Sequence, residues 1–310
     1  MNNPPPSAPH HPAHLPIAAV ERDTGLSKDT LRVWERRYGF PTPLRDSHGE
    51  RVYPEDQVTR LRLIRRLLDH GHRPSRVVGN SLTELSALLG HHDGAQTPVD
   101  PGRWEALLAL LQAHQGLALR SALQQQLLKQ GLQGFVRDTV APLTRAVGDA
   151  WMLGKLDVTA EHLYTEQVQN VLRSAIGSLT TTGQSPRILL TTLPGELHGL
   201  GLLMVEASLA PESVTCVSLG TQTPIGDIQA ATLIGDFQVV ALSFSAAFTH
   251  RRALAALATL RAKLPDTVEI WAGGQALAGH HGRLTGTRIC PTLDEAHGAL
   301  AAWREAHPTA

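Results

Sequence analysis

The feature that most limits what this chain can fold into is an alternation of short β-rich runs and helical runs after residue 186. Helical stretches such as 251–264 and 293–305 separate the β-rich runs. The β-rich runs cover residues 187–193, 214–219, 239–244, 268–271 and 287–290. Strands that alternate with helices predict parallel βαβ units, and therefore a doubly wound, flavodoxin-like α/β sheet.

A histidine follows the first β-rich run in a loop with small neighbours. The loop reads Glu196, Leu197, His198, Gly199, Leu200, Gly201. Ligands of open α/β sheets bind outside the carboxyl ends of the strands, so His198 could ligate a metal centre there while the glycines admit a bulky ligand. A single histidine between glycines is weak evidence by itself, and the alternative is an ordinary loop histidine near a helix start.

The loop resembles the cobalamin-binding signature, written D/E-x-H-x-x-G. The corrinoid-binding family also carries Ser-x-Leu after its third strand and Gly-Gly after its fourth, which line the slot for the nucleotide tail. Here Gly273 and Gly274 follow the fourth run, whereas Ser243-Phe244-Ser245 keeps the first Ser and lacks the Leu. The resemblance implies that His198 is the lower axial cobalt ligand, with Glu196 hydrogen-bonded to its other ring nitrogen. It implies cofactor contacts for Gly199, Gly201, Ser243, Gly273 and Gly274.

A second motif lies upstream, where Trp151 is followed after nine residues by Glu161 and His162. This spacing is similar to that of the CarH or LitR-type cobalamin-dependent photoreceptor repressors. In that family the Trp covers the upper face of a 5′-deoxyadenosyl group and the Glu holds its ribose, as an aromatic wall and a hydroxyl acceptor can. The alternative is a core Trp and a solvated helix start.

Met152 departs from the CarH-type pattern, in which the residue after the motif Trp is commonly a His that becomes the upper cobalt ligand after light. A thioether is a poor ligand for oxidised cobalt compared with imidazole. We therefore expect no bis-imidazole adduct through Met152, and His162 is the nearest histidine by sequence that could take this place.

Residues 15–78 predict a winged helix-turn-helix. Gly25 marks a turn, and Ser27 is the expected N-cap of a helix over 28–38. The segment Thr-Leu-Arg-x-Trp-Glu-Arg-Arg-Tyr-Gly at 30–39 resembles MerR-type cobalamin regulators. A cationic helix of this size fits the major groove, and a wing follows it. The candidate DNA contacts are Lys28, Arg32, Arg36, Arg45, His48, Arg51 and Tyr53.

Charge supports a DNA-binding segment in a chain that balances overall, with 28 basic and 28 acidic residues. Residues 15–78 hold thirteen Lys and Arg against nine Asp and Glu, so the rest of the chain is net acidic. Phosphate contacts supply much of the affinity for DNA, and this asymmetry favours a DNA-binding part joined to a sensor part.

The expected organisation is multidomain, α and α/β. Residues 1–13 predict a disordered tail, 14–79 the winged helix-turn-helix, 80–102 a helix remnant and linker, 103–183 a four-helix bundle, and 184–310 the cobalamin-binding sheet. The Trp151 helix is expected to end at Gly154, and Asp157 or Thr159 to cap the next. Cys216 and Cys290 fall in predicted strands and are expected to be buried thiols.

These features together predict an adenosylcobalamin-dependent, light-responsive transcriptional repressor rather than an enzyme. The family implies operator DNA as partner, a homotetramer in the dark, and release when light cleaves the cobalt–carbon bond. No apolar run reaches about eighteen residues, so we expect no membrane contact and a cytoplasmic protein. One alternative is a corrinoid carrier module of a methyltransferase or isomerase. The other is a MerR-type regulator that works without cobalamin.

Overall fold

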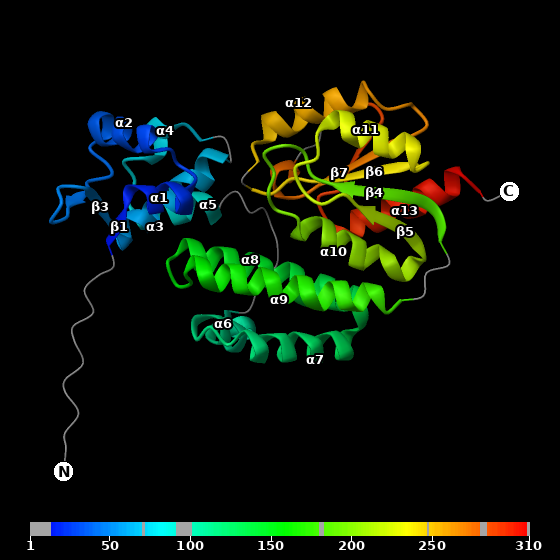
Figure 1. The fold of residues 1–310 in the computed structure, drawn as a ribbon, viewed down its shortest axis with the longest axis horizontal. Coiled ribbons are helices and arrows are strands. Elements are labelled where there is room, and N and C mark those ends of the chain that lie inside the picture. The colour runs from blue at the N-terminus through cyan, green and yellow to red at the C-terminus, as the bar shows by residue number, and fades with distance from the viewer. Residues whose placement is uncertain are drawn as a thin grey trace, which may run out of the picture. The chain divides into compact units, whose positions relative to one another are not determined.

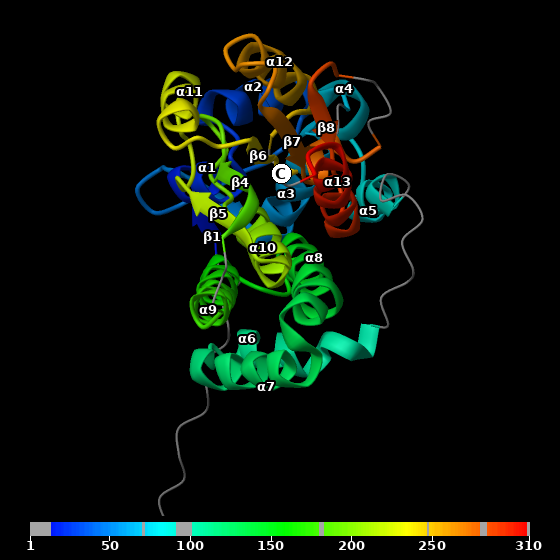
Figure 2. The same cartoon turned by 90° about the vertical axis from the view of Figure 1, so that its right-hand side faces the viewer.

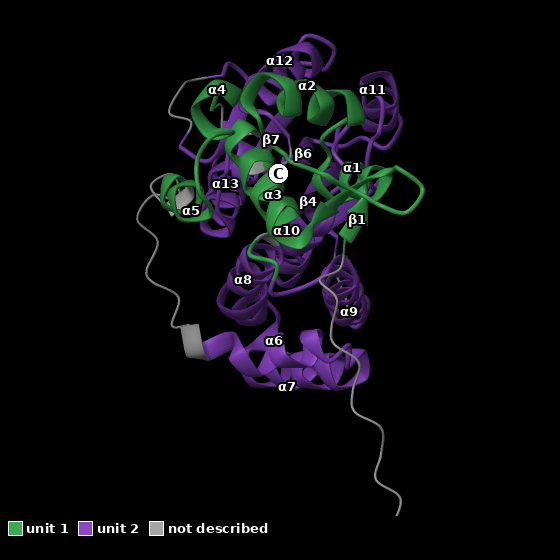
Figure 3. Cartoon of the chain, turned by 90° about the vertical axis from the view of Figure 1, so that its left-hand side faces the viewer, with its two compact units in different colours: residues 1–68, 72–96, 152–154 green, residues 69–71, 97–151, 155–310 purple. Residues whose placement is uncertain are grey.

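The computed structural model describes residues 14–69, 72–90, 101–179, 183–246, 248–279 and 284–308. The chain divides into two compact units (Figure 3). The first, here called the head, comprises residues 1–68, 72–96 and 152–154, and the second, called the body, comprises 69–71, 97–151 and 155–310. The expected tail at 1–13 and positions 91–100 of the expected linker lie outside the described residues.

The head begins with two helices that end where their capping residues predict. α1 (Ile17–Thr24) ends at Gly25, whose φ is 67°. The Ser27 side chain accepts a hydrogen bond from the backbone N–H of Thr30 and so caps α2 (Lys28–Tyr38), which ends at Gly39. A residue without a Cβ adopts the left-handed conformation at Gly25 at little cost. The predicted turn, N-cap and second helix are therefore confirmed.

A three-stranded antiparallel sheet and a third helix complete the winged fold. β3 (Arg51–Pro54) lies between β1 (His14–Pro16) and β2 (Leu44–Arg45). α3 (Glu55–Asp69) follows β3 directly. The side chain of Gln57 on α3 accepts a hydrogen bond from the backbone N–H of Thr42 and donates one to its carbonyl. These bonds fix the segment that joins α2 to β2. The core of the head contains Leu31, Trp34, Tyr53, Leu61 and Ile64.

Two further helices extend the head beyond the third: α4 (Pro74–Val77) and α5 (Leu82–Gly90). The second of them occupies the span in which the sequence predicts a helix remnant and linker. Glu84 accepts hydrogen bonds from the backbone and hydroxyl of Ser81, and the Ser81 hydroxyl accepts from the backbone of Glu84. These reciprocal bonds cap the helix, and fully buried Leu85 fixes it to the head.

The first part of the body is the predicted set of four helices (Figure 2). They are α6 (Glu105–Gln112), α7 (Gly116–Phe135), α8 (Ala141–Met152) and α9 (Val158–Gly177). A short helix η1 (Pro101–Trp104) precedes them, and the π-helical η2 (Val136–Val140) joins α7 to α8. Asp157 caps α9 by accepting from the backbone N–H of Ala160. This confirms one of the two predicted caps.

The second part of the body is a five-stranded parallel sheet in the order β5-β4-β6-β7-β8. Its strands are β4 (Gln184–Thr191), β5 (Val214–Ser218), β6 (Val239–Ser243), β7 (Glu269–Gly273) and β8 (Thr287–Ile289). All neighbouring strands are parallel. The sequence-based prediction of a flavodoxin-like, doubly wound sheet is therefore confirmed.

Helices cover both faces of this sheet (Figure 1). α11 (Ile225–Ile234) and α12 (His250–Arg261) lie on one face, and α10 (Leu200–Leu209) and α13 (Leu293–Ala306) on the other. Short helices η3 (Ala210–Glu212) and η4 (Gln275–Leu277) follow α10 and β7. Alternate residues of β4 point to opposite faces, since Leu189 joins the first apolar cluster and Leu190 the second.

The bundle and the sheet share α10. Its Leu203 and Ala207 pack in the bundle core, whereas Leu202 and Leu209 pack on the sheet. The start of α9 lies on the same side of the body as the carboxyl ends of the strands (Figure 1). The bundle therefore brings its α8–α9 end toward the edge where α/β sheets bind ligands.

One polar contact also joins the bundle to the sheet. The side-chain amide of Gln133 on α7 donates to the Ser208 carbonyl at 3.1 Å and to Glu212 at 3.0 Å. Among the described residues, no helix combines the length and apolar character that crossing a membrane requires.

Candidate functional site

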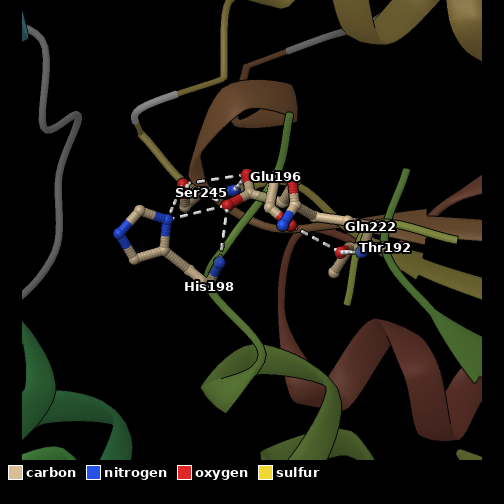
Figure 4. Close-up of polar contacts among 5 residues, drawn as sticks. All are labelled: Thr192, Glu196, His198, Gln222 and Ser245. Carbon is tan, nitrogen blue, oxygen red and sulfur yellow. Dashed lines mark hydrogen bonds and ion pairs between the residues drawn. The ribbon is translucent and has the colours of Figure 1, made fainter. Parts of the chain in front are cut away.

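The His198 loop lies between β4 and α10, at the carboxyl edge of the sheet (Figure 4). The hydroxyl of Thr192, directly after β4, donates to the Glu196 carbonyl at 2.7 Å. The same hydroxyl accepts from the backbone N–H of Gln222, at 2.9 Å, in the loop after β5. Thr192 therefore ties the His198 loop to the neighbouring strand end and fixes its path.

Glu196 and His198 form a directed pair. The Glu196 side chain is 1% exposed, and its Oε1 accepts from the His198 backbone N–H at 2.9 Å and lies 2.7 Å from His198 Nδ1. A carboxylate only accepts, so Nδ1 carries the proton in this contact. The imidazole is 60% exposed. In the neutral imidazole the other nitrogen, Nε2, has a lone pair, and it points away from the carboxylate (Figure 4).

Ser245, in the segment after β6, is the third member of this cluster. Its backbone N–H donates to Glu196 Oε2 at 2.8 Å, and its hydroxyl lies 2.9 Å from the same oxygen. The hydroxyl is also 3.0 Å from His198 Nδ1. The sequence pattern singled out Ser243 and treated position 245 as the place of a missing Leu. Ser245 is thus a residue of the site that the motif did not identify.

The hydrogen bonds of the cluster decide the charge of its members. Burial alone raises the pKa of Glu196, but the hydrogen bonds from His198 and Ser245 outweigh it, and the net pKa is lowered. The hydrogen bond to Glu196 is the main cause of a raised pKa for His198. Glu196 is therefore held as a carboxylate. Its hydrogen bond to Nδ1 makes the imidazole a more basic ligand for a metal ion.

The glycines of the two motifs have a structural reason of their own. A Cβ on Gly201 would collide with the hydroxyl of Ser243. A Cβ on Gly273 would collide with the Cys290 carbonyl, and one on Gly274, whose φ is 98°, with the Phe244 carbonyl. Ser243 and these glycines therefore mark where the strand ends and α10 meet without intervening side chains, at the edge that carries His198.

Glu161 approaches this edge from the bundle. It lies in the first turn of α9 and its Oε1 accepts from the Thr165 hydroxyl at 3.0 Å. Its charge contributes to the raised pKa of His198, so the two side chains are within electrostatic reach of each other. Glu161 and His198, which are 37 positions apart in sequence, are thus near each other in the body.

The other residues of the upstream motif differ in surroundings. Trp151 is half-buried and packs against the apolar core of the bundle. His162 is exposed on α9. Met152 is the last residue of α8, and its side chain lies outside the described part of the chain. Large apolar side chains are exposed nearby in sequence, at Leu197 in the loop and Val158 at the start of α9.

The basic residues of the head form two groups, of which the first lies on α2. Arg32 and Arg36 are exposed, and Arg32 lies 3.5 Å from Asp29. Lys28 is half-buried and pairs with Glu21 at 3.5 Å. These are surface contacts between flexible side chains, which DNA phosphates can replace at little cost.

The second group belongs to the wing. Arg45 donates to the Gly49 carbonyl and His48 is exposed, both at the β2–β3 turn. Arg51 pairs with Glu35 of α2 at 3.1 Å, which links the wing to that helix. Tyr53 is fully buried, and burial raises the pKa of its hydroxyl. The prediction of Tyr53 as a DNA contact is wrong for this structure, because its strand turns the side chain into the core.

Both cysteines are free thiols. Cys216 is half-buried on β5, Cys290 is buried just after β8, and burial raises the pKa of each to about 12. The prediction of buried thiols agrees with Cys290, whereas Cys216 is only half-buried.

Comparison with known proteins agrees with the architecture. Residues 15–79 match the model of the MerR HTH family regulatory proteins. A solved structure, the monomethylamine corrinoid protein of Methanosarcina barkeri, superimposes on 66% of this chain and on all of its own, with a TM-score of 0.51 and 14% identity. At 14% identity, this similarity shows that the two chains share a fold and shows nothing about function.

Two relatives extend over most of the chain. The HTH-type transcriptional repressor CarH of Myxococcus xanthus is 29% identical over 262 residues, 83% of this chain and 87% of its own. The HTH-type transcriptional repressor CarA of the same organism is 30% identical over 231 residues, 74% of this chain and 76% of its own. The chain therefore belongs to the CarA and CarH family of MerR-type transcriptional repressors.

Proposed function

We propose that this repressor binds adenosylcobalamin between the bundle and the sheet and releases operator DNA in the light. The observation that carries the proposal is the cluster of His198, Glu196 and Ser245, which turns an exposed imidazole nitrogen outward at the carboxyl edge of the sheet. The corrinoid protein from Methanosarcina barkeri, named for its corrinoid, has the same fold.

The residues at this edge fit a cobalt corrinoid. Imidazole is a suitable ligand for cobalt, and a ligating imidazole usually donates its other N–H to a carboxylate, as His198 donates to Glu196. A corrin ring is broad and largely apolar, and exposed Leu197 offers it an apolar surface beside the ligand.

Each residue then has a distinct task. His198 would ligate the cobalt, while Glu196 and Ser245 would keep the imidazole ring in one orientation and one tautomer. Trp151 would cover the adenosyl group, and Glu161 would accept from its ribose, held in place by Thr165. Adenosylcobalamin supplies a cobalt–carbon bond that light breaks.

Met152 separates this protein from the CarH-type pattern at the upper side. Because a thioether binds oxidised cobalt poorly, we expect no second imidazole ligand from position 152 after illumination. Exposed His162 is the candidate that this chain offers instead. Desalting of the illuminated protein tests retention of the cofactor, with Met152→His expected to increase retention and His162→Ala to reduce it. Equal retention in all three proteins would contradict both assignments.

The head would bind operator DNA through the basic face of α2 and the wing. Cofactor binding would assemble a homotetramer in the dark, which multiplies operator contacts through effective concentration. The helix-turn-helix match and the repressor relatives support the DNA-binding part. For such a regulator we propose a cytoplasmic location. A corrinoid carrier of an enzyme is disfavoured, because the relatives over most of the chain are repressors.

The decisive experiment is the visible spectrum of full-length protein mixed with adenosylcobalamin in the dark. We expect saturable binding with a base-on spectrum, and a shift toward the base-off form with weaker binding for His198→Ala. His307→Ala, which removes a histidine at the far end of α13, is the matched control. Unchanged spectra and affinity for His198→Ala would overturn the assignment of the ligand.

Assembly and operator binding in the dark and after illumination test the regulatory part. Size-exclusion chromatography should show a larger species only with adenosylcobalamin in the dark, and operator fragments should be retarded under that condition alone. Equal retardation of operator fragments with and without adenosylcobalamin, in the dark and in the light, would favour a regulator that works without cobalamin.

A further inference from the structure

The solvent-facing side of α2 carries one apolar side chain among charged ones. Its exposed residues include Asp29, Arg32, Arg36 and Arg37, and among them lies Val33, which is 42% exposed. At 100° per residue, Val33 falls between Asp29 and Arg37 on that face. The opposite face of the helix is buried through Leu31 and Trp34.

Folding of the head does not explain a valine at this position. An exposed apolar side chain gains little from burial. A β-branched residue also lowers helix propensity relative to alanine or a long polar residue. Both effects count against Val33 in the isolated head. A ligand that covers this face would offset them.

The chemistry of the major groove supplies such a ligand. In helix-turn-helix proteins the second helix enters the groove, and here that helix is α2. The groove presents donors and acceptors on every base pair, and its exposed apolar group is the C5-methyl of thymine. Around the helix, Arg36 lies on one side of Val33 and Arg37 on the other, and both can meet base edges or phosphates there.

We propose that Val33 is a specificity-determining residue that contacts a thymine methyl in the operator. The inference rests on the operator-binding part of the proposed function. It predicts that the preferred sequence contains a thymine whose methyl group is needed, at a position beside the bases or phosphates that Arg36 and Arg37 contact.

The test uses full-length protein with adenosylcobalamin in the dark and a preferred duplex selected from a random pool. Each thymine of that duplex is replaced singly by uracil, which removes the methyl and keeps the base pairing. We expect one such replacement to weaken wild-type binding about fourfold, the factor that burial of one methyl-sized group is worth. Val33→Ala should bind the thymine and uracil duplexes equally well.

Alanine favours helix more than valine, so Val33→Ala should not unfold α2, and its thermal midpoint should equal or exceed that of the wild type. Leu82→Ala, which removes another exposed apolar side chain of the head, is the matched control and should keep the sensitivity to uracil. Two outcomes would overturn the inference about Val33 and leave the operator-binding proposal intact. One is sequence-selective binding in which no thymine can be distinguished from uracil. The other is a sensitivity to uracil that Val33→Ala retains. Absence of any sequence-selective binding would overturn the operator-binding proposal and this inference with it.

Discussion

Glu196 in the body and Glu35 in the head each hold a basic side chain at a candidate site, but their surroundings differ. The side chain of Glu196 is 1% exposed and bonds to His198 and to both the backbone and hydroxyl of Ser245. The side chain of Glu35 is 32% exposed and pairs with Arg51. A buried, multiply bonded carboxylate fixes one atom in space, whereas an exposed pair leaves its cation free to exchange partners. The body is built to present one nitrogen, and the head to present a set of movable charges.

The largest effect should come from breaking the buried carboxylate. Glu196→Gln leaves an amide N–H facing donors on one side of the cluster, so the orientation of His198 is lost. We expect the affinity for adenosylcobalamin to fall about 10- to 100-fold in dark titrations. The matched change in the head, Glu35→Gln, should leave cobalamin affinity unchanged and alter folding stability by less than about 1 kcal/mol. Similar effects of the two changes on cobalamin affinity would remove the contrast between the regions.

The exposed charges of the head should act on DNA and not on the cofactor. Arg32→Ala is expected to cost roughly 1–3 kcal/mol of operator binding if the side chain meets a base. Arg51→Ala should lower the slope of log affinity against log salt by about 1 if its guanidinium leaves Glu35 for a phosphate. Operator titrations at several salt concentrations measure both. Wild-type binding in both variants would rule out this face as the DNA contact.

A smaller effect is expected from Ser245→Ala. Glu196 keeps its bonds to His198 and to the backbone N–H at position 245, and loses the hydroxyl. Only one of the hydrogen bonds that hold the carboxylate is lost, so cobalamin binding should weaken less than in Glu196→Gln. Ser178→Ala, on the distant end of α9, serves as the control. A larger loss than in Glu196→Gln would mean that Ser245 has a role other than holding the carboxylate.

The smallest effect concerns Tyr53. Its buried hydroxyl has no hydrogen-bond partner among the described residues. Tyr53→Phe removes an unpaired polar group, so the free energy of unfolding should rise by up to about 1 kcal/mol while operator affinity stays the same. Reduced operator affinity would restore Tyr53 as a DNA contact and require the wing to rearrange on binding.

Local signals account for what the sequence predicts correctly. The caps at Ser27 and Asp157, the turn at Gly25 and the alternation of strands with helices depend on residues a few positions apart. The helix at 225–234 was not singled out, because its apolar residues do not gather on one face. Periodicity therefore carries no signal there.

Tertiary contacts account for what the sequence misses at the sites. Ser245 meets Glu196 across 49 residues, and only the register of β4 beside β6 brings them together. Tyr53 was assigned to DNA because it follows Arg51 on the wing, but on β3 it pairs with Leu15 and turns inward. Which face of a short strand is buried depends on the rest of the fold.

The contact of Gln133 with Ser208 and Glu212 affects how the body unfolds. Because that amide and the shared helix α10 join the bundle to the sheet, neither can lose its structure without exposing the core of the other. Calorimetry should therefore record the body as one cooperative transition, and hydrogen exchange should protect α7, α10 and β4 to a similar degree. A ligand that stabilises the sheet then raises the melting temperature of the bundle as well.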